Sequence, residues 1–172
     1  SLVGSEMCIR DRFTSTSAVC VTGLAVLDTG SYWSVFGQTV IMFLIQIGGL
    51  GVITTATAVF ILSGRKISIM QRSTMQNAIS APKVGGIVRL MSFILKGTLL
   101  IELIGALFMI PVFCHDFGLR GIWMSIFHSV SAFCNAGFDL LGTKWHPFVS
   151  LTSYAVNPVI NICLLYTSDA AD

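Results

Sequence analysis

The sequence predicts an all-α polytopic membrane protein built from repeated units. Composition is the first observation: 54% of the 172 residues are apolar and only 10% are charged, whereas a soluble domain carries about a quarter charged residues. The second is a run without a charge from Ser34 to Leu62, long enough to cross a bilayer. The third is an octapeptide that recurs later in the chain. Each unit is expected to contain a helix, a re-entrant helix, a glycine turn and a further helix.

The ionisable residues exclude several classes of protein. Ten basic and eight acidic side chains give a net charge of +2, too small for a protein that depends on binding nucleic acid. The five cysteines form no CxxC pair, no histidine stands at a metal-ligand spacing from them, and the three histidines are scattered singly. These spacings predict neither a zinc site nor a disulfide framework. We therefore expect no cofactor and no resident metal in this chain.

The two ends differ from the remainder in composition. Residues 1–12 place four charged side chains against an apolar stretch, and residues 163–172 end an apolar run with CLLYTSDAAD. Both strings resemble translated sequencing-adapter read-through, so we expect non-native flanks, with natural polar termini as the alternative. The remaining chain divides into the end of a first repeat at 13–62, a basic linker at 63–92 and a second repeat at 93–162.

The charge-free run from Ser34 to Leu62 is expected to be one long helix. At 1.5 Å per residue it would measure about 43 Å, which exceeds the ~30 Å hydrocarbon core of a bilayer. It must therefore tilt, bend or protrude. Gly48, Gly49 and Gly51 mark the expected weak point, and small residues here also favour close packing against another helix.

Two further apolar segments extend over about Phe93–Phe113 and Phe148–Ile162. The first is a second predicted span, with Glu102 near its middle. A carboxylate at that depth is either functional or bonded to a neighbouring helix, and the sequence leaves both interpretations open. In this chain alone we expect Gln46 and Glu102 to lack partner helices.

The connection between the first two spans provides the topology signal. Its charged residues are all basic, whereas the charges in the other connections nearly cancel. The positive-inside rule therefore predicts that the linker at 63–92 is cytoplasmic and that the remaining loops face outside. A binding site for lipid head groups or a partner protein is the alternative interpretation. The basic residues are Arg65, Lys66, Arg72, Lys83 and Arg89.

Two other segments are too short and too polar to cross a bilayer. Phe13–Val19 and about Gly121–Phe133 are rich in serine and threonine, and each leads into a glycine-bearing turn. Hydrophobic stretches of this length in membrane proteins are often re-entrant. We expect the second segment to enter from the outer side and return there, because its neighbours have the charge pattern of outer loops.

The clearest signal is an internal repeat. SAVCVTGL at 17–24 matches SAFCNAGF at 131–138 with a constant spacing of 114 residues, and the shared pattern is S-A-x-C-x-x-G-[LF]. The similarity continues after a slip of two residues, because Trp33 corresponds to Trp145. The repeat therefore includes a short helix, a glycine turn, a loop and the start of the next helix.

The glycine turns that follow the two short helices have the chemistry of a cation site. Non-helical backbone inside a membrane persists only where protein or water satisfies its carbonyl groups. A ring of such carbonyls can replace the hydration shell of a cation, and the partly negative C-terminal end of a short helix favours the same charge. Glycine permits the backbone angles and close approach that this arrangement needs. The candidate ion-binding residues are Val21, Thr22 and Gly23 in the first copy and Asn135, Ala136 and Gly137 in the second.

Two carboxylates follow these turns. Asp28 and Asp139 could concentrate cations at the mouth of a pore. They could equally cap local turns, as aspartate often does. The residue pattern leaves both roles open.

Four strings occur in order along the chain: TSAVCVTGL, VLDTGSYWSVFGQ, LIQIGGLG and SVSAFCNAGFDL. They resemble the pore subunits of Ktr-type potassium transporters, in the Trk/Ktr/HKT superfamily, over nearly all of residues 13–162. The resemblance implies a potassium-channel-like fold in which four repeats surround one pore and each contributes one selectivity-filter glycine. Gly23 would be the first of these and Gly137 the second. Glycine at the first position goes with a preference for potassium in this superfamily.

The resemblance also implies an activity and an assembly. It implies potassium uptake across the cell membrane by a multi-pass protein, with sodium or a proton as candidate coupling ion, and no enzymatic activity. The pore subunits would form a homodimer in the lipid bilayer on a cytosolic nucleotide-binding ring, with no nucleic acid partner. By the same resemblance, this chain is a fragment that covers about the first two of four repeats.

Two other classes of function stay open from the residues alone. One is an intramembrane enzyme with Cys134 as nucleophile and His128 as base, although no third residue completes a triad. The other is a membrane assembly subunit that transports nothing. Cys20 and Cys134 are expected to act as small buried apolar residues, and His128 as a packed histidine. The complete reading frame discriminates, since a four-repeat transporter must contain two more such units.

Overall fold

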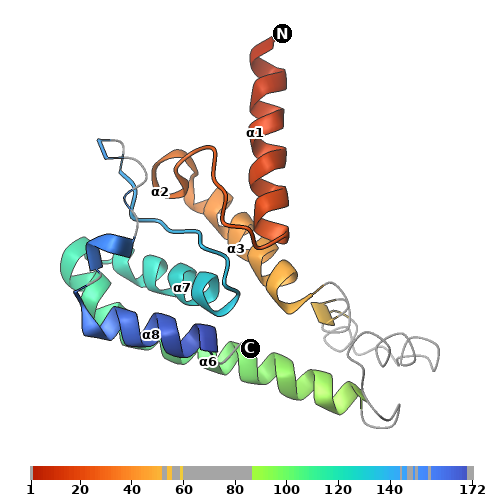
Figure 1. Ribbon diagram of the computed structural model, residues 1–172, viewed down its shortest axis with the longest axis vertical. Helices are drawn as coiled ribbons and strands as arrows, with labels where there is room; N and C mark the ends of the chain where they lie inside the picture. Colours follow the sequence, from red (N-terminus) through yellow and green to blue (C-terminus); the bar gives the residue numbers. More distant parts are fainter. Residues whose placement is uncertain are drawn as a thin grey trace. The chain divides into compact units, whose positions relative to one another are not determined.

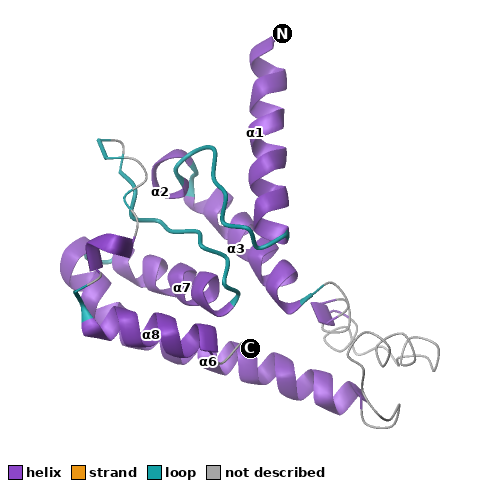
Figure 2. Ribbon diagram, in the orientation of Figure 1, coloured by secondary structure: helices purple, strands orange, loops and turns teal. Residues whose placement is uncertain are grey.

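The computed structural model describes residues 2–51, 54–55, 59, 87–143, 145–146, 149, 151–154 and 156–169. These residues form helices and loops without a strand, in agreement with the predicted all-α class (Figure 2). The helices, which Figure 1 follows along the chain, are α1 (Leu2–Val19), α2 (Thr29–Tyr32), α3 (Val35–Leu50), α6 (Ile87–Phe117), α7 (Arg120–Phe133), the 3-10 helix η1 (Leu151–Tyr154) and α8 (Pro158–Asp169).

The chain forms two compact units. The larger consists of Ser1–Gly49 and Ile101–Asp172, and the smaller of Leu50–Leu100. Most of the linker predicted at 63–92 lies outside the described residues, because the description resumes at residue 87 with the start of α6. The candidate turns, both carboxylates that follow them and Glu102 all belong to the larger unit.

Among the described residues, one helix is long and apolar enough to cross a membrane, Val88–Phe117 within α6. The span predicted at Phe93–Phe113 is therefore confirmed as a helix, and it continues beyond both predicted ends. Large apolar side chains such as Leu103 and Phe108 are exposed along it. Exposed apolar surface of this kind suits contact with lipid tails.

The long helix predicted over Ser34–Leu62 is interrupted. α3 ends at Leu50, and Gly51 has a φ of +79°, the left-handed conformation that commonly ends a helix. A new helical bond begins there, since the Thr55 N–H donates to the Gly51 carbonyl at 3.1 Å. The weak point predicted at the glycines is thus confirmed, and it lies at Gly51.

The two short helices end where the sequence predicts. α7 ends at Phe133, as expected, and begins one residue before the predicted Gly121. α1 ends at Val19 but begins at Leu2, so the helix expected from Phe13 is continuous with residues of the predicted flank.

α8 begins later than the apolar segment predicted from Phe148. The Asn157 side chain accepts a hydrogen bond from the Val159 N–H at 3.0 Å, which caps the helix, and Pro158 occupies the first helical position. Asparagine is favoured as an N-cap, and proline suits the next position because it has no N–H to leave unbonded. The Asn-Pro pair therefore sets the start of this helix.

The core of the larger unit is formed by side chains of α1, α3, α6, α7 and α8, and α7 packs against α8. Its fully buried side chains include Met109 and Phe113 from α6, Phe127 from α7 and Ile160 from α8. The Phe113 ring stacks on the imidazole of His128, with 5.1 Å between ring centroids. α7, which leads into the second glycine turn, is therefore held on several sides.

Candidate functional site

The turns after α1 and α7 have the same backbone conformation. Among the described residues, Val21 and Asn135 are the non-glycine residues with positive φ, at 55° and 53°. Two residues later, Gly23 and Gly137 have φ of 71° and 70°. In these turns the repeat is thus one of backbone geometry as well as of sequence.

Both helices also end with the same hydrogen bond. The Thr22 N–H donates to the Ser17 carbonyl at 3.0 Å, and the Ala136 N–H donates to the Ser131 carbonyl at 2.8 Å. A bond of this span around a left-handed residue is the Schellman motif, a common helix end. The motif accounts for the positive φ of the residue before each donor. It does not account for the glycine that follows, which is left-handed as well.

The two turns lie side by side although they are more than a hundred residues apart in sequence. A Cβ atom placed on Gly23 would lie 2.6 Å from the Ala136 carbonyl oxygen and 3.3 Å from the Gly137 Cα. A Cβ on Gly137 would in turn lie 3.5 Å from the Gly23 Cα. Glycine at position 23 is therefore required twice, by its φ and by this close approach.

Two adjacent glycines of α3 contact the ends of both short helices. A Cβ on Gly48 would overlap the Val19 carbonyl and lie 2.9 Å from the Val21 Cγ2. A Cβ on Gly49 would lie 2.6 Å from the Cys134 Cβ. The close packing predicted for these glycines is confirmed, and α3 touches the end of α1 with one and the end of α7 with the other.

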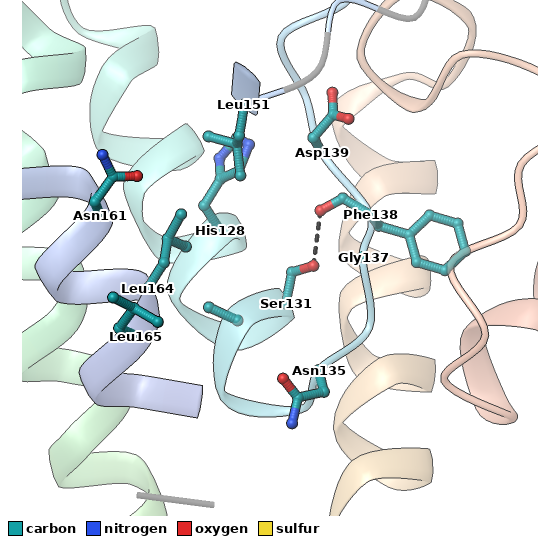
Figure 3. A pocket seen from close by; sticks show the side chains of 11 residues that line it. His128, Ser131, Asn135, Gly137, Phe138, Asp139, Leu151, Asn161, Leu164 and Leu165 are labelled. Carbon is teal, nitrogen blue, oxygen red and sulfur yellow. Dashed lines mark hydrogen bonds between the residues drawn. The ribbon is translucent and has the colours of Figure 1, made fainter. Parts of the chain in front are cut away.

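A cavity of about 700 Å³ lies between α7, the segment that follows it and α8. Three of the predicted site residues, Asn135, Gly137 and Asp139, line it (Figure 3). The Ser131 hydroxyl, on α7, donates to the Phe138 carbonyl at 2.7 Å across one side of it. The cavity thus opens directly beside the second glycine turn.

His128 binds two backbone groups. Its Nε2 accepts a hydrogen bond from the Leu140 N–H at 3.3 Å, and its Nδ1 lies 2.7 Å from the Met124 carbonyl. Because Nε2 accepts, the ring proton belongs on Nδ1, where it is donated to that carbonyl. His128 therefore fastens the segment after the second turn to α7, which agrees with the predicted packed histidine.

The two candidate pore-mouth carboxylates both cap local turns. Asp28 Oδ2 accepts from the Ser31 N–H at 2.8 Å at the start of α2, and Asp139 Oδ1 accepts from the Leu141 N–H at 3.1 Å. Burial raises the pKa of Asp139 above its ordinary value, and the negative charge of Asp28 adds to the rise, against the effect of the Leu141 hydrogen bond. Turn capping, one of the two roles left open, is thus observed for both.

Side chains that the sequence does not single out hold the loop after the first turn. Gln38 Nε2 donates to the Trp33 carbonyl at 3.1 Å, while its Oε1 accepts from Trp123 Nε1 at 2.9 Å. Arg120 donates to the Gly30 carbonyl at 3.1 Å. The sequence indicates such contacts only by isolated polar residues within or next to apolar helices, and it does not determine which of these residues form hydrogen bonds with one another.

Glu102 and Gln46 are partners, so the expectation that both lack one is wrong. Gln46 Nε2, on α3, donates to Glu102 Oε1, on α6, at 2.8 Å. The two helices lie far apart in sequence, and each supplies the hydrogen-bond partner that the other needs within this chain.

The two cysteines of the repeat differ in exposure. Cys134 is buried, as predicted, whereas Cys20 is exposed, contrary to its predicted burial.

An apolar helix long enough to cross a bilayer and two converging turns of non-helical backbone fit the class of integral membrane proteins. The chain belongs to the TrkH family of cation transport proteins, which it matches over residues 4–168. Membership of this family places the chain in a membrane.

Three curated relatives are similar to this chain over most of its length. The potassium/sodium uptake protein NtpJ of Enterococcus hirae is 49% identical over 131 residues, which are 76% of this chain and 29% of the relative. The Ktr system potassium uptake protein B of Bacillus subtilis is 43% identical over 155 residues, 90% of this chain and 34% of the relative. The Ktr system potassium uptake protein B of Vibrio alginolyticus is 36% identical over 148 residues, which are 85% of this chain and 32% of the relative. The chain spans about a third of the length of these relatives.

Proposed function

We propose that this chain is part of the pore-forming subunit of a Ktr-type transporter that takes up potassium across the cell membrane. The observation that supports it is the pair of equivalent turns, after α1 and α7, with the same φ angles and with Gly23 against Gly137. The ion follows from the relatives, which are named for potassium uptake or for potassium and sodium uptake.

The backbone carbonyls of the two turns would contribute half of a selectivity filter. Left-handed residues break the helical hydrogen-bond ladder, which leaves carbonyl groups that a dehydrated cation can bind. Each turn directly follows the C-terminal end of a helix, α1 or α7, whose partial negative charge favours a cation. The proposed filter residues are Val21, Thr22, Gly23, Asn135, Ala136 and Gly137, with Asp28 and Asp139 near the mouth.

The rest of the filter would come from chain outside this sequence. Relatives three times as long leave room for two further units. We propose that the full-length subunit forms a homodimer on a cytosolic nucleotide-binding ring, as the resemblance to Ktr-type subunits implies. In this topology the linker at 63–92 is cytoplasmic and the filter loops face outside.

The enzyme alternative has little support from the side chains it needs. A base must offer a free nitrogen to its nucleophile. Both ring nitrogens of His128 are engaged with backbone groups of Met124 and Leu140, and the Cys134 thiol faces Gln46 Oε1 at 4.0 Å. Neither side chain is available for a nucleophile–base pair.

Complementation tests the proposed function. The full-length protein would be expressed in a bacterial strain that lacks its own potassium uptake systems, and growth at low potassium and rubidium uptake would be measured. We expect the wild type to restore both, and Gly23→Asp to restore neither at equal membrane abundance, because it places a side chain against the Ala136 carbonyl. Wild-type protein that reaches the membrane without any uptake would indicate an assembly subunit instead.

A further inference from the structure

A polar cluster joins α3, α6 and α7 next to the second turn. Its members are Gln46 from α3, Glu102 from α6 and Cys134 at the end of α7. Gln46 Nε2 donates to Glu102 Oε1 at 2.8 Å, and the Cys134 thiol faces Gln46 Oε1 at a longer 4.0 Å. Glu102 is only 6% exposed. A buried carboxylate without hydrogen bonds is costly, so this partnership fixes both side chains.

The hydrogen bond to Glu102 determines which end of the Gln46 amide faces the Cys134 thiol. An amide has a donating and an accepting end. Because the carboxylate of Glu102 takes the NH₂ group, the carbonyl oxygen is the end left to face Cys134. Cys134 is the C-cap of α7 and immediately precedes the turn Asn135–Gly137. The orientation set at Glu102 therefore reaches, through the Gln46 side chain, the residue that immediately precedes that turn.

Two further contacts hold the same junction. The Ser129 hydroxyl of α7 donates to the main-chain carbonyl of Glu102 at 2.6 Å. Gly49, one turn of α3 beyond Gln46, contacts Cys134 so closely that any side chain there would displace it. The equivalent cysteine of the first turn, Cys20, is exposed and has no such cluster around it within the described part of the chain.

We propose that Glu102 is a positioning residue for ion selectivity. Through Gln46 it holds Cys134, and thereby sets the carbonyl positions of Asn135–Gly137 on which discrimination between potassium and sodium depends. This inference rests on the proposed function of the two turns. It assigns to Glu102, a residue whose role the sequence left open, an indirect effect on the ion and no contact with it.

The test uses the full-length protein with near-isosteric changes. Glu102→Leu and Gln46→Leu remove the hydrogen-bonding groups and keep most of the volume, while Glu102→Gln keeps an acceptor for Gln46. The measurement is rubidium uptake against increasing sodium, normalised to protein in the membrane. Both leucine variants should lose about three- to tenfold in discrimination against sodium, and Glu102→Gln should stay within about twofold of wild type.

The test includes two further changes: an exchange of the Gln46 and Glu102 side chains, and Gly137→Ser in the proposed filter. Gln46→Glu alone should lower discrimination, since it places two carboxylates together, and adding Glu102→Gln should restore it by reversing the pair. If the leucine variants fail to accumulate, the role of Glu102 is tested by comparing Gln46→Glu with the double variant Gln46→Glu/Glu102→Gln. Wild-type discrimination in the leucine variants, or a swap that restores abundance but not discrimination, would overturn the role of Glu102. If Gly137→Ser also discriminates normally, the proposed function fails as well.

Discussion

Val21 holds a left-handed backbone conformation that its β-branched side chain opposes. Such a conformation costs an L-residue about 1–2 kcal/mol, and a branched residue there is a genuine outlier. Asn135, at the equivalent position, tolerates it better because a short polar side chain can bond locally. The Schellman bonds at both helix ends offset the cost, since they satisfy carbonyls that would otherwise be free.

The strain at this position can be measured in the second turn. Asn135→Val should destabilise the full-length protein by about 1–2 kcal/mol relative to Asn135→Gly, because only valine opposes a φ of 53°. The measurement is the melting temperature of each purified protein in detergent. Both variants lose the asparagine side chain, so their difference isolates the backbone. Equal melting temperatures would contradict the left-handed conformation.

Asp139 gives a pH dependence with a definite sign. Its raised pKa means that the carboxylate loses its charge at a higher pH than an ordinary aspartate. If this charge attracts cations at the mouth, potassium uptake at limiting potassium should fall on mild acidification. Folding stability should instead increase on mild acidification. A raised pKa means that the folded state favours the protonated form of Asp139, and this contribution to stability is lost as pH rises through the raised pKa. Asp139→Asn should remove both effects, and an unchanged pH profile of uptake would exclude the mouth role.

The sequence predicts where a helix begins or ends most accurately when a particular residue or motif marks that boundary. The end of α7 follows from the repeat, and the break after α3 follows from Gly51. The start of α8 follows from Asn157 and Pro158, but apolar composition alone extends the segment upstream to Phe148. Hydropathy measures what a membrane would accept, whereas caps decide where a helix begins.

Close packing at the end of α3 gives a prediction for the helices. Gly49→Ala should destabilise the full-length protein by about 1–3 kcal/mol, because the new methyl group would overlap the Cys134 side chain. Gly97→Ala in α6 is the matched control, since no atom lies within 4 Å of a Cβ there in the described part of the chain. Alanine favours a helix over glycine, so Gly97→Ala should be neutral or stabilising. The check is thermal unfolding in detergent, and equal effects of both changes would exclude the contact.

Across the whole molecule, sequence reasoning finds the two glycine turns but not the side chains that hold them in place. The repeat identifies both turns because the same octapeptide appears twice. The pairs Gln46–Glu102 and Gln38–Trp123 join residues that lie more than fifty positions apart. A single polar residue in an apolar helix indicates that a partner exists, but only the packing of helices determines which one it is.

The proposed four-turn filter leads to a prediction for the 172-residue chain by itself. Reconstituted in liposomes, the 172-residue chain should give no potassium flux, because two turns leave part of any filter without carbonyls and unsatisfied backbone in lipid costs several kcal/mol per group. The full-length protein under the same conditions is the control. Sustained, potassium-selective flux from the chain alone would contradict the proposal that two further units complete the filter.

We propose that the carbonyls of the two glycine turns select the ion. The most direct measurement is rubidium uptake by the full-length protein in competition with sodium, for Gly23→Ser and Gly137→Ser, with Cys20→Ala as an exposed control next to the first turn. A side chain at position 23 meets the Ala136 carbonyl at 2.6 Å, so the turns must separate. We predict weaker discrimination against sodium in both serine variants and wild-type discrimination in Cys20→Ala. Unchanged discrimination in both serine variants at equal membrane abundance would show that these carbonyls do not select the ion.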